Sequence, residues 1–164
     1  VKLLIENGHK EILCIRGVPH SMPSKERVKG YIDALRESGF DTRSRITGND
    51  YSITNGYLET KLAIGSPARP TAIFALSNTI MLGAIRAIGE SSLRIPDDVS
   101  ILSFDNNLFL DFLHPAVTRI SQPTKEISQL VVKILVERLS DKQSVPQQIK
   151  LPAQIIEGKS VKRL

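Results

Sequence analysis

The chain has 164 residues, of which 41% are hydrophobic, 24% charged and 5% aromatic, with a formal net charge of +5 at pH 7. This composition fits a globular domain with a buried core, and no stretch approaches the roughly 20 apolar residues of a membrane span, so we expect a soluble protein. Dispersed basic residues and few aromatic residues argue against a nucleic-acid groove. The single cysteine, Cys14, lies in an apolar run, which excludes an internal disulfide and favours a buried position.

Helical and strand patterns alternate from the first residues onward. Residues 1–7 have the pattern of a helix end that stops at Gly8, and because the first residue is a valine we expect the chain to begin within a longer polypeptide. Residues 11–16 are a short apolar strand. Ser24 is placed to cap the next helix, whose apolar spacing continues to Gly39. These elements form a first βα unit.

The rest of the chain repeats this alternation. Strands are expected at 42–46, 71–76, 99–104, 117–121, 148–151 and 154–156. Helices are expected at 54–64, 78–89 and 123–139, with a short helical stretch before His114. Such regular alternation predicts an α/β fold in which helices flank a parallel sheet and the crossovers are right-handed.

Polar residues follow several of the expected strands. In an open parallel sheet, ligands bind beyond the carboxyl ends of the strands, which makes these residues candidates for a site. They are Ser24, Arg27, Asn78, Asp105 and Gln122. Carboxylates accept hydrogen bonds, guanidinium groups donate them and amides do both, so the set suits a ligand with several hydroxyl groups. Helix capping by Asn78, a turn at Asp105 and an exposed ion pair at Arg27 are the structural alternatives.

The sequence offers little evidence of catalysis. The three histidines lie in turns or before a proline, and no nucleophile elbow, paired-carboxylate spacing, glycine-rich phosphate loop or HExxH pattern is found. We therefore expect no catalytic residues, no metal site and no cofactor. An enzyme on a doubly wound α/β fold stays open as an alternative.

Eight short stretches carry a family resemblance, and the succession from Ile95 onward is the most specific. They are Leu3–His9, Arg27–Tyr31, Phe74–Asn78, Leu82–Ala84, Ile95–Ser100, Phe104–Asn106, His114–Pro115 and Thr118–Pro123. Together they resemble the carboxyl-terminal part of the effector-binding core of the lactose-repressor (LacI/GalR) family of bacterial transcription regulators. The resemblance implies a periplasmic-binding-protein-like type I fold.

The resemblance also implies an effector-binding site of six residues: Ser24, Arg27, Tyr51, Asn78, Asp105 and Gln122. The arginine and the carboxylate would contact the effector, the asparagine would bind its hydroxyls and the tyrosine would pack on it. The serine would lie in a loop that lines the pocket, and the glutamine at the crossover between two lobes. Two positions depart from the family: Thr79 replaces an aspartate, so the helix needs another cap, and Gly158 replaces an arginine whose contacts are then in doubt.

The family's two-lobed architecture implies a division of the chain. Residues 1–9 would end a helix of the amino-terminal lobe, 10–122 would form the carboxyl-terminal lobe, 123–151 would return to the first lobe and 152–164 would cross back. A helix-turn-helix headpiece would precede Val1, so this chain alone is not expected to bind operator DNA. The apolar faces of helices at 1–8 and 124–139 would lack part of their packing and expose apolar surface.

The function implied by the resemblance is sensing. The chain would be the effector-binding part of a cytoplasmic, homodimeric regulator that binds a sugar or sugar phosphate and thereby changes its affinity for operator DNA, with no membrane partner. Purine nucleobases are an alternative class of effector. Residues 80–88 could supply part of the dimer interface or could equally be a core helix. A periplasmic sugar-binding protein of an ABC transporter, which shares the fold, is an alternative function.

Overall fold

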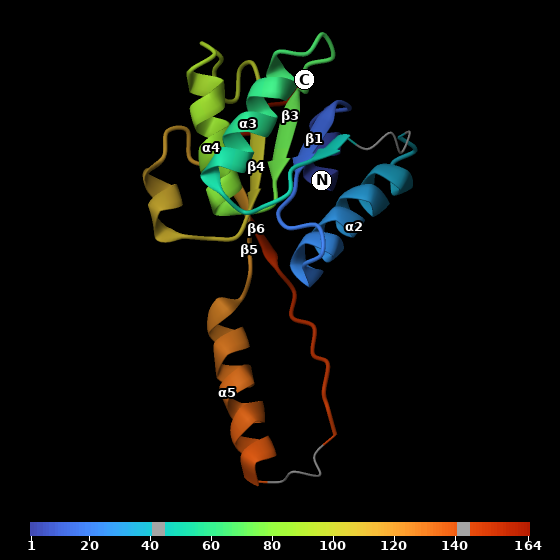
Figure 1. Cartoon of the computed structure of the whole chain (residues 1–164), viewed down its shortest axis with the longest axis vertical. Coiled ribbons are helices and arrows are strands. Elements are labelled where there is room, and N and C mark those ends of the chain that lie inside the picture. Colours follow the sequence, from blue (N-terminus) through green and yellow to red (C-terminus); the bar gives the residue numbers. More distant parts are fainter. Residues whose placement is uncertain (41–44, 141–144) are drawn as a thin grey trace.

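A computed structural model of the chain describes residues 1–40, 45–140 and 145–164, which form a six-stranded sheet with helices on both faces (Figure 1). The strands are β1 (Ile12–Ile15), β2 (Arg45–Thr47), β3 (Ala72–Ala75), β4 (Ser100–Phe104), β5 (Thr118–Ser121) and β6 (Gln154–Ile156). The helices are α1 (Lys2–Glu6), α2 (Met22–Glu37), α3 (Ile53–Ile64), α4 (Asn78–Gly89), the 3-10 helix η1 (Leu108–Phe112) and α5 (Thr124–Ser140). The predicted α/β class is confirmed.

The strand order is β2-β1-β3-β4-β5-β6. All neighbours from β2 to β5 are parallel, and the register places Leu13 opposite Ile73 and Ile73 opposite Ile101. β6 runs antiparallel to β5, with Ile120 opposite Ile155. The predicted parallel sheet is confirmed from β2 to β5, and the parallel pairing does not extend to β6. The chain leaves the end of β5 through α5 and returns to that same end, so the next strand must run the opposite way.

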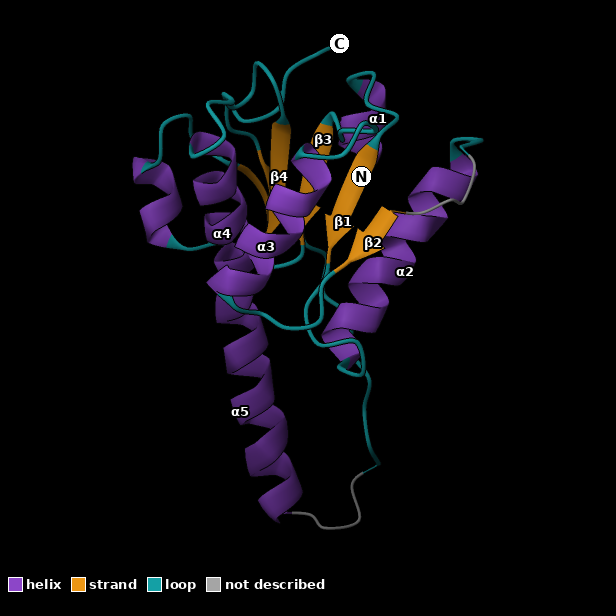
Figure 2. Cartoon of the chain, turned by 45° about the horizontal axis from the view of Figure 1, so that its top comes forward, coloured by secondary structure: helices purple, strands orange, loops and turns teal. Residues whose placement is uncertain are grey.

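The sheet separates two layers of core, as Figure 2 shows, with α2 on one side and α3 and α4 on the other. Alternate residues of β1 supply both layers: Leu13 and Ile15 pack toward α4, whereas Ile12 and Cys14 pack toward α1 and α2. All four side chains are buried because both faces of the sheet are covered. The predicted burial of Cys14 is confirmed.

Two glycines allow α3 and α4 to pack in close contact. A Cβ atom on Gly56 would lie 2.0 Å from the carbonyl oxygen of Ile80, and one on Gly83 would lie 2.0 Å from that of Ile53. Both distances are far below van der Waals contact, so larger residues at these positions would force the helices apart. This contact fixes the position of α4 on the sheet.

The apolar side of α4 belongs to the core of the chain. Ile80, Met81, Ala84 and Ile88 are all buried and pack with the apolar residues of β3 and β4. The core interpretation is confirmed for these four side chains. Leu82 and Ile85 are only partly buried, so a contribution of residues 80–88 to a dimer interface stays a prediction.

Helix α5 extends away from the sheet, and the segment that returns to β6 runs back along it (Figure 1). None of its residues is buried, and Val131, Leu135 and Leu139 are more than half exposed. The expected exposure of apolar surface is confirmed for this helix. In α1, Leu4 is fully buried and packs with Tyr31 of α2, whereas Val1, Leu3 and Ile5 are only partly buried, so part of the apolar surface expected there is exposed. The lobe boundaries stay a prediction, although these contacts favour grouping α1 with residues 10–122.

Two predicted strands differ from the structure. Residues 148–151 are exposed and pair with no strand among the described residues, so the strand expected there is wrong. Of the strand expected at 42–46, residues 42–44 lie outside the described residues, and β2 begins at Arg45. No helix within the described ranges is long and apolar enough to cross a membrane.

Candidate functional site

Three of the predicted site residues meet at the carboxyl ends of the central strands. Asp105 follows β4, Gln122 follows β5 and Arg27 lies in the second turn of α2. Oδ1 of Asp105 accepts hydrogen bonds from Nη2 of Arg27 at 3.2 Å and from Nε2 of Gln122 at 2.6 Å. Nη1 of Arg27 donates to the carbonyl oxygen of Leu76, just after β3, at 2.6 Å. We call Arg27, Asp105 and Gln122 the polar cluster; it ties α2 to three neighbouring strand ends.

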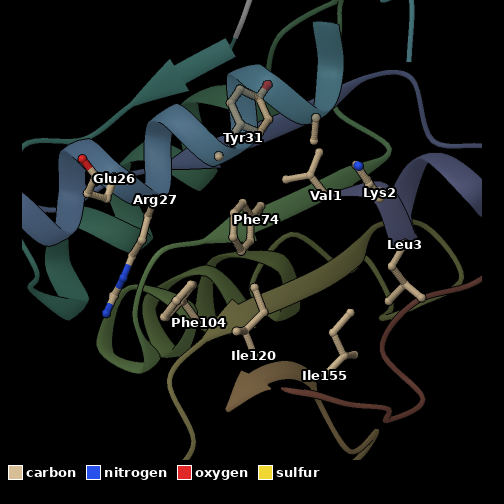
Figure 3. A pocket seen from close by; sticks show the side chains of 12 residues that line it. Val1, Lys2, Leu3, Glu26, Arg27, Tyr31, Phe74, Phe104, Ile120 and Ile155 are labelled. Atoms are coloured by element: carbon tan, nitrogen blue, oxygen red, sulfur yellow. The ribbon is translucent and has the colours of Figure 1, made fainter. Parts of the chain in front are cut away.

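Arg27 is held on a second side by an aromatic ring. Its guanidinium carbon lies 3.8 Å from the centroid of the Phe104 ring, and Figure 3 shows the side chain reaching from α2 toward that ring. The side chains of Arg27 and Asp105 are 15% and 32% exposed, so the ion pair is open to a ligand while partly shielded from water. Among the described residues, both hydrogen bonds to Asp105 use Oδ1, which leaves Oδ2 to accept from a ligand.

The backbone of Asp105 is in the left-handed region, with φ of 78°. Aspartate and asparagine enter this region more readily than most residues, yet the conformation costs energy and persists only where neighbours determine it. The predicted turn at Asp105 is therefore confirmed together with the predicted meeting of its carboxylate with Arg27. The turn interpretation and the candidate-site interpretation of Asp105 are therefore compatible.

Tyr51 lies at the same edge of the sheet and joins two loops. Its hydroxyl lies 3.2 Å from Oγ of Ser21, which precedes α2, and its carbonyl oxygen accepts a hydrogen bond from Oγ1 of Thr79 at the start of α4. Its ring covers Gly17, where a Cβ atom would lie 2.1 Å from the ring. Glycine is therefore required after β1 if the tyrosine ring is to border the strand ends.

The structure corrects two predicted helix caps. Oγ of Ser21, not that of Ser24, accepts from a backbone amide at the start of α2, at 3.3 Å from the nitrogen of Ser24. At α4, Oγ of Ser77 accepts from the amide of Ile80 at 3.2 Å, so Ser77 rather than Asn78 is the N-cap. The expectation that the helix with Thr79 needs another cap is confirmed.

Asn78 and Ser24 lie apart from the polar cluster in their contacts. Oδ1 of Asn78 accepts from Oγ of Ser103 on β4 at 3.4 Å, a long hydrogen bond. Ser24 is inside α2 rather than in a loop, is 1% exposed, and its Oγ has no partner among the described residues. It borders a different hollow, of about 420 Å³, together with Arg16 and Lys29. The predicted roles of both residues toward an effector stay predictions.

A largely apolar hollow of about 450 Å³ lies beside the cluster, on the face of the sheet covered by α1 and α2 (Figure 3). Phe74, Phe104, Ile120 and Ile155 contribute to its walls, and Arg27 lies in its lining. These walls offer few groups that could recognise hydroxyls, whereas the polar cluster offers several. We therefore place the candidate site at the strand ends, with the hollow as its apolar neighbour.

Sequence reasoning missed Phe104, Ser21 and the reason for Gly158. Pro23 in the first turn of α2 is a signal for an N-cap just before it, which points to Ser21. A Cβ atom on Gly158 would lie 2.2 Å from the carbonyl oxygen of Ala116, so the arginine found in the family does not fit this backbone. Within the described ranges, no group of three or more His, Cys, Asp or Glu side chains is placed to hold a metal ion.

The family model of the periplasmic binding protein-like domain matches residues 1–161. The chain belongs to this family. Its relatives include the HTH-type transcriptional repressor PurR of Actinobacillus pleuropneumoniae, which is 37% identical over 164 residues, covering 98% of this chain and 49% of the relative. The chain thus spans about half the length of the curated relatives it matches.

Solved structures agree with this membership. The putative transcriptional regulator LacI of Bacillus cereus subsp. cytotoxis has a TM-score of 0.94 at 26% identity, covering 99% of this chain and 58% of that one. A LacI family transcriptional regulator of Enterococcus faecium with bound ribose has a TM-score of 0.88 at 25% identity, covering 99% and 60%. The resemblance to the effector-binding core of LacI/GalR regulators is confirmed, and the relatives named here are transcriptional regulators rather than enzymes.

Proposed function

We propose that this chain is the effector-sensing part of a bacterial transcriptional regulator and that it binds a small polyhydroxylated molecule, a sugar or sugar phosphate, at the polar cluster. The observation that carries the proposal is the convergence of Arg27 and Gln122 on one oxygen of Asp105, at the ends of parallel strands. The relative with bound ribose supports the ligand class.

Each residue of the polar cluster has a different role in binding such a ligand. Oδ2 of Asp105, which has no hydrogen-bond partner among the described residues, accepts hydrogen bonds from hydroxyls, and the amide of Gln122 orients the carboxylate. The guanidinium of Arg27 is fixed on the Phe104 ring and donates to ligand oxygens at the edge that faces the strand ends. Fixing these groups before binding lowers the entropic cost of recognition.

Binding becomes regulation when the ligand has different affinities for two arrangements of the protein. In this proposal the effector lies between two lobes, and Gln122 stands where the chain leaves one lobe for the other. The altered lobe orientation changes the affinity of an amino-terminal helix-turn-helix headpiece for operator DNA. The regulator works in the cytoplasm as a homodimer, for which the exposed Leu58 and Leu62 of α3 offer apolar surface.

Calorimetric titration of the full natural polypeptide tests the proposal. Ribose, other sugars, phosphorylated sugars and purine nucleobases are compared as ligands. We expect a sugar or sugar phosphate to bind, and the variants Arg27→Ala and Asp105→Asn to weaken that binding about tenfold or more, as loss of a charged hydrogen bond does. Arg94→Ala is the control, since that arginine is 74% exposed before β4. Unchanged affinity in both site variants would show that the site is wrong.

A further inference from the structure

Arg119 is a buried arginine in the middle of strand β5. The residue is 4% exposed and lies opposite Ser103 of β4, on the face of the sheet that also carries Ile101 and η1. Burying a guanidinium group is costly unless its donors are satisfied. A charged residue at this inward position therefore requires a structural or functional reason.

Each of the three nitrogens in the Arg119 side chain donates one hydrogen bond. Nε donates to Oδ1 of Asn106 at 2.7 Å, and Nη2 donates to Oδ1 of Asp111 at 2.6 Å. Nη1 donates to the carbonyl oxygen of Val117, just before β5, at 3.2 Å. Two of the three bonds thus go to the segment 106–111, which follows Asp105 and leads through η1.

The contact with Asn106 lies next to the strained residue of the candidate site. Asp105 has φ of 78°, and its side chain is held by Arg27 and Gln122 on one side. Arg119 holds the following residue on the other side. A left-handed aspartate persists only where its surroundings determine it, and these two sets of contacts flank Asp105 on both sides.

We propose that Arg119 is a positioning residue for the effector site: by holding Asn106 and Asp111 it fixes the backbone of Asp105 and so presents the carboxylate in its binding orientation before a ligand arrives. Arg119 itself touches no ligand in this proposal. The inference rests on the proposed function only for its consequence for binding, since the effect on the segment 105–112 can be measured without any ligand.

Arg119→Met is the decisive variant because it keeps an apolar stem of similar length and removes the donors. The fold is expected to tolerate it, since Asn106 and Asp111 are exposed and water can replace the lost bonds. Hydrogen–deuterium exchange is measured on the ligand-free full natural polypeptide. We expect amides of residues 105–112 to exchange about tenfold faster, while those of α3 and α4 keep their rates. Arg94→Met, at an exposed arginine, is expected to change neither.

Asn106→Ala separates positioning from general support. If Arg119 acts through Asn106, this variant accelerates exchange at 105–107, and the double variant exceeds Arg119→Met little or not at all at these amides. Unchanged exchange at 105–112 in Arg119→Met would overturn the proposal. So would a uniform increase over the whole chain, which would show a merely structural role.

Titration with D-ribose measures whether Arg119 affects the affinity for a ligand. If the wild type binds ribose, Arg119→Met is expected to raise Kd about tenfold, whereas Arg94→Met leaves Kd unchanged. If the wild type binds neither ribose nor any other compound of the screen, the proposed function fails, while the exchange result still decides the role of Arg119. A Kd that is unchanged in Arg119→Met despite faster exchange would overturn the consequence for binding.

Discussion

The guanidinium group of Arg27 lies against the ring of Phe104, 3.8 Å from its centroid, while its nitrogens bond to Asp105 and Leu76. An aromatic ring attracts a cation at its face and leaves the guanidinium edge free to donate, so the ring orients Arg27 for a ligand. We expect Phe104→Leu to weaken effector binding about three- to tenfold, corresponding to roughly 1 kcal/mol of lost cation–π interaction. Phe104→Tyr keeps the ring face and serves as the control in the same titration. Equal affinities of the Leu and Tyr variants would contradict this role.

The close contact of α3 and α4 predicts opposite effects at two glycines. Gly83→Ala would place a methyl group 2.0 Å from the carbonyl oxygen of Ile53, and we expect it to lower the free energy of unfolding by about 1–3 kcal/mol. Gly30→Ala lies in α2 with nothing within 4 Å of the added carbon. It should raise stability by roughly 0.5–1 kcal/mol because glycine is entropically costly in a helix. Urea denaturation measures both, and equal effects would be inconsistent with the helix contact.

The two serines at the start of α2 form a second matched pair. Ser21→Ala removes the N-cap acceptor and should cost about 1 kcal/mol. Ser24→Ala removes a buried hydroxyl that has no partner among the described residues, so it should cost nothing or slightly stabilise the fold. Thermal unfolding distinguishes the two variants. A larger loss of stability in Ser24→Ala than in Ser21→Ala would show that Ser24 is the N-cap.

His9 makes stability depend on pH. The residue is fully buried, with Nδ1 3.0 Å from Oγ1 of Thr71 and Nε2 3.0 Å from the carbonyl oxygen of Lys162. That carbonyl can only accept, so Nε2 carries the proton in the neutral ring. Burial lowers the pKa of His9 below its ordinary value of 6.5. The unfolded chain therefore binds a proton first as the pH falls.

It follows that the contribution of His9 is complete above pH 6.5 and is lost as the pH falls from there through the lower pKa of the folded state. We expect the melting temperature of His9→Gln to depend less on pH between about 7 and 5 than that of the wild type. His20→Gln, at an exposed histidine, should keep the wild-type dependence. An unchanged slope in His9→Gln would assign the pH dependence to other groups.

Cys14 is expected to be inert while the chain is folded. It is fully buried, and burial raises the pKa of its thiol to about 12, so almost no thiolate is present at pH 8. A thiol reagent such as DTNB should react only after unfolding in guanidinium chloride. Rapid reaction of the native protein would show that the core around β1 opens readily.

The sequence was sufficient to predict the grouping of Arg27, Asp105 and Gln122, because the direction of parallel strands brings their ends together whatever the details of packing. The helix cap of α2 and the direction of β6 depend on contacts between distant parts of the chain, which the local sequence pattern does not reveal. Ser21 and Ser24 are both acceptable caps, and the difference lies in where the backbone first becomes helical. The antiparallel direction of β6 depends on the path of the chain after α5, which residues 154–156 do not encode.

The strand expected at 148–151 failed for the same reason. Residues 148–151 have an apolar pattern that suits a strand, but a strand also needs a neighbour with free backbone groups, and these residues are exposed without one among the described residues. Arg119 is buried although a charged residue in a short strand suggests an exposed position. Its burial depends on Asn106 and Asp111, whose approach in space only the structure reveals.

The pairing of β5 with β6 connects the direction of α5 to the edge of the sheet. The chain leaves through β5 and comes back through β6 as one hydrogen-bonded ribbon, so α5 and its return segment share the direction of this ribbon. A helix of 17 residues is roughly 25 Å long at about 1.5 Å per residue. A tilt of α5 by about 10° near Gln122 would therefore move the far end of the helix by roughly 4 Å. A small change of angle beside Asp105 would thus become a displacement large enough to break or make contacts at a distant surface.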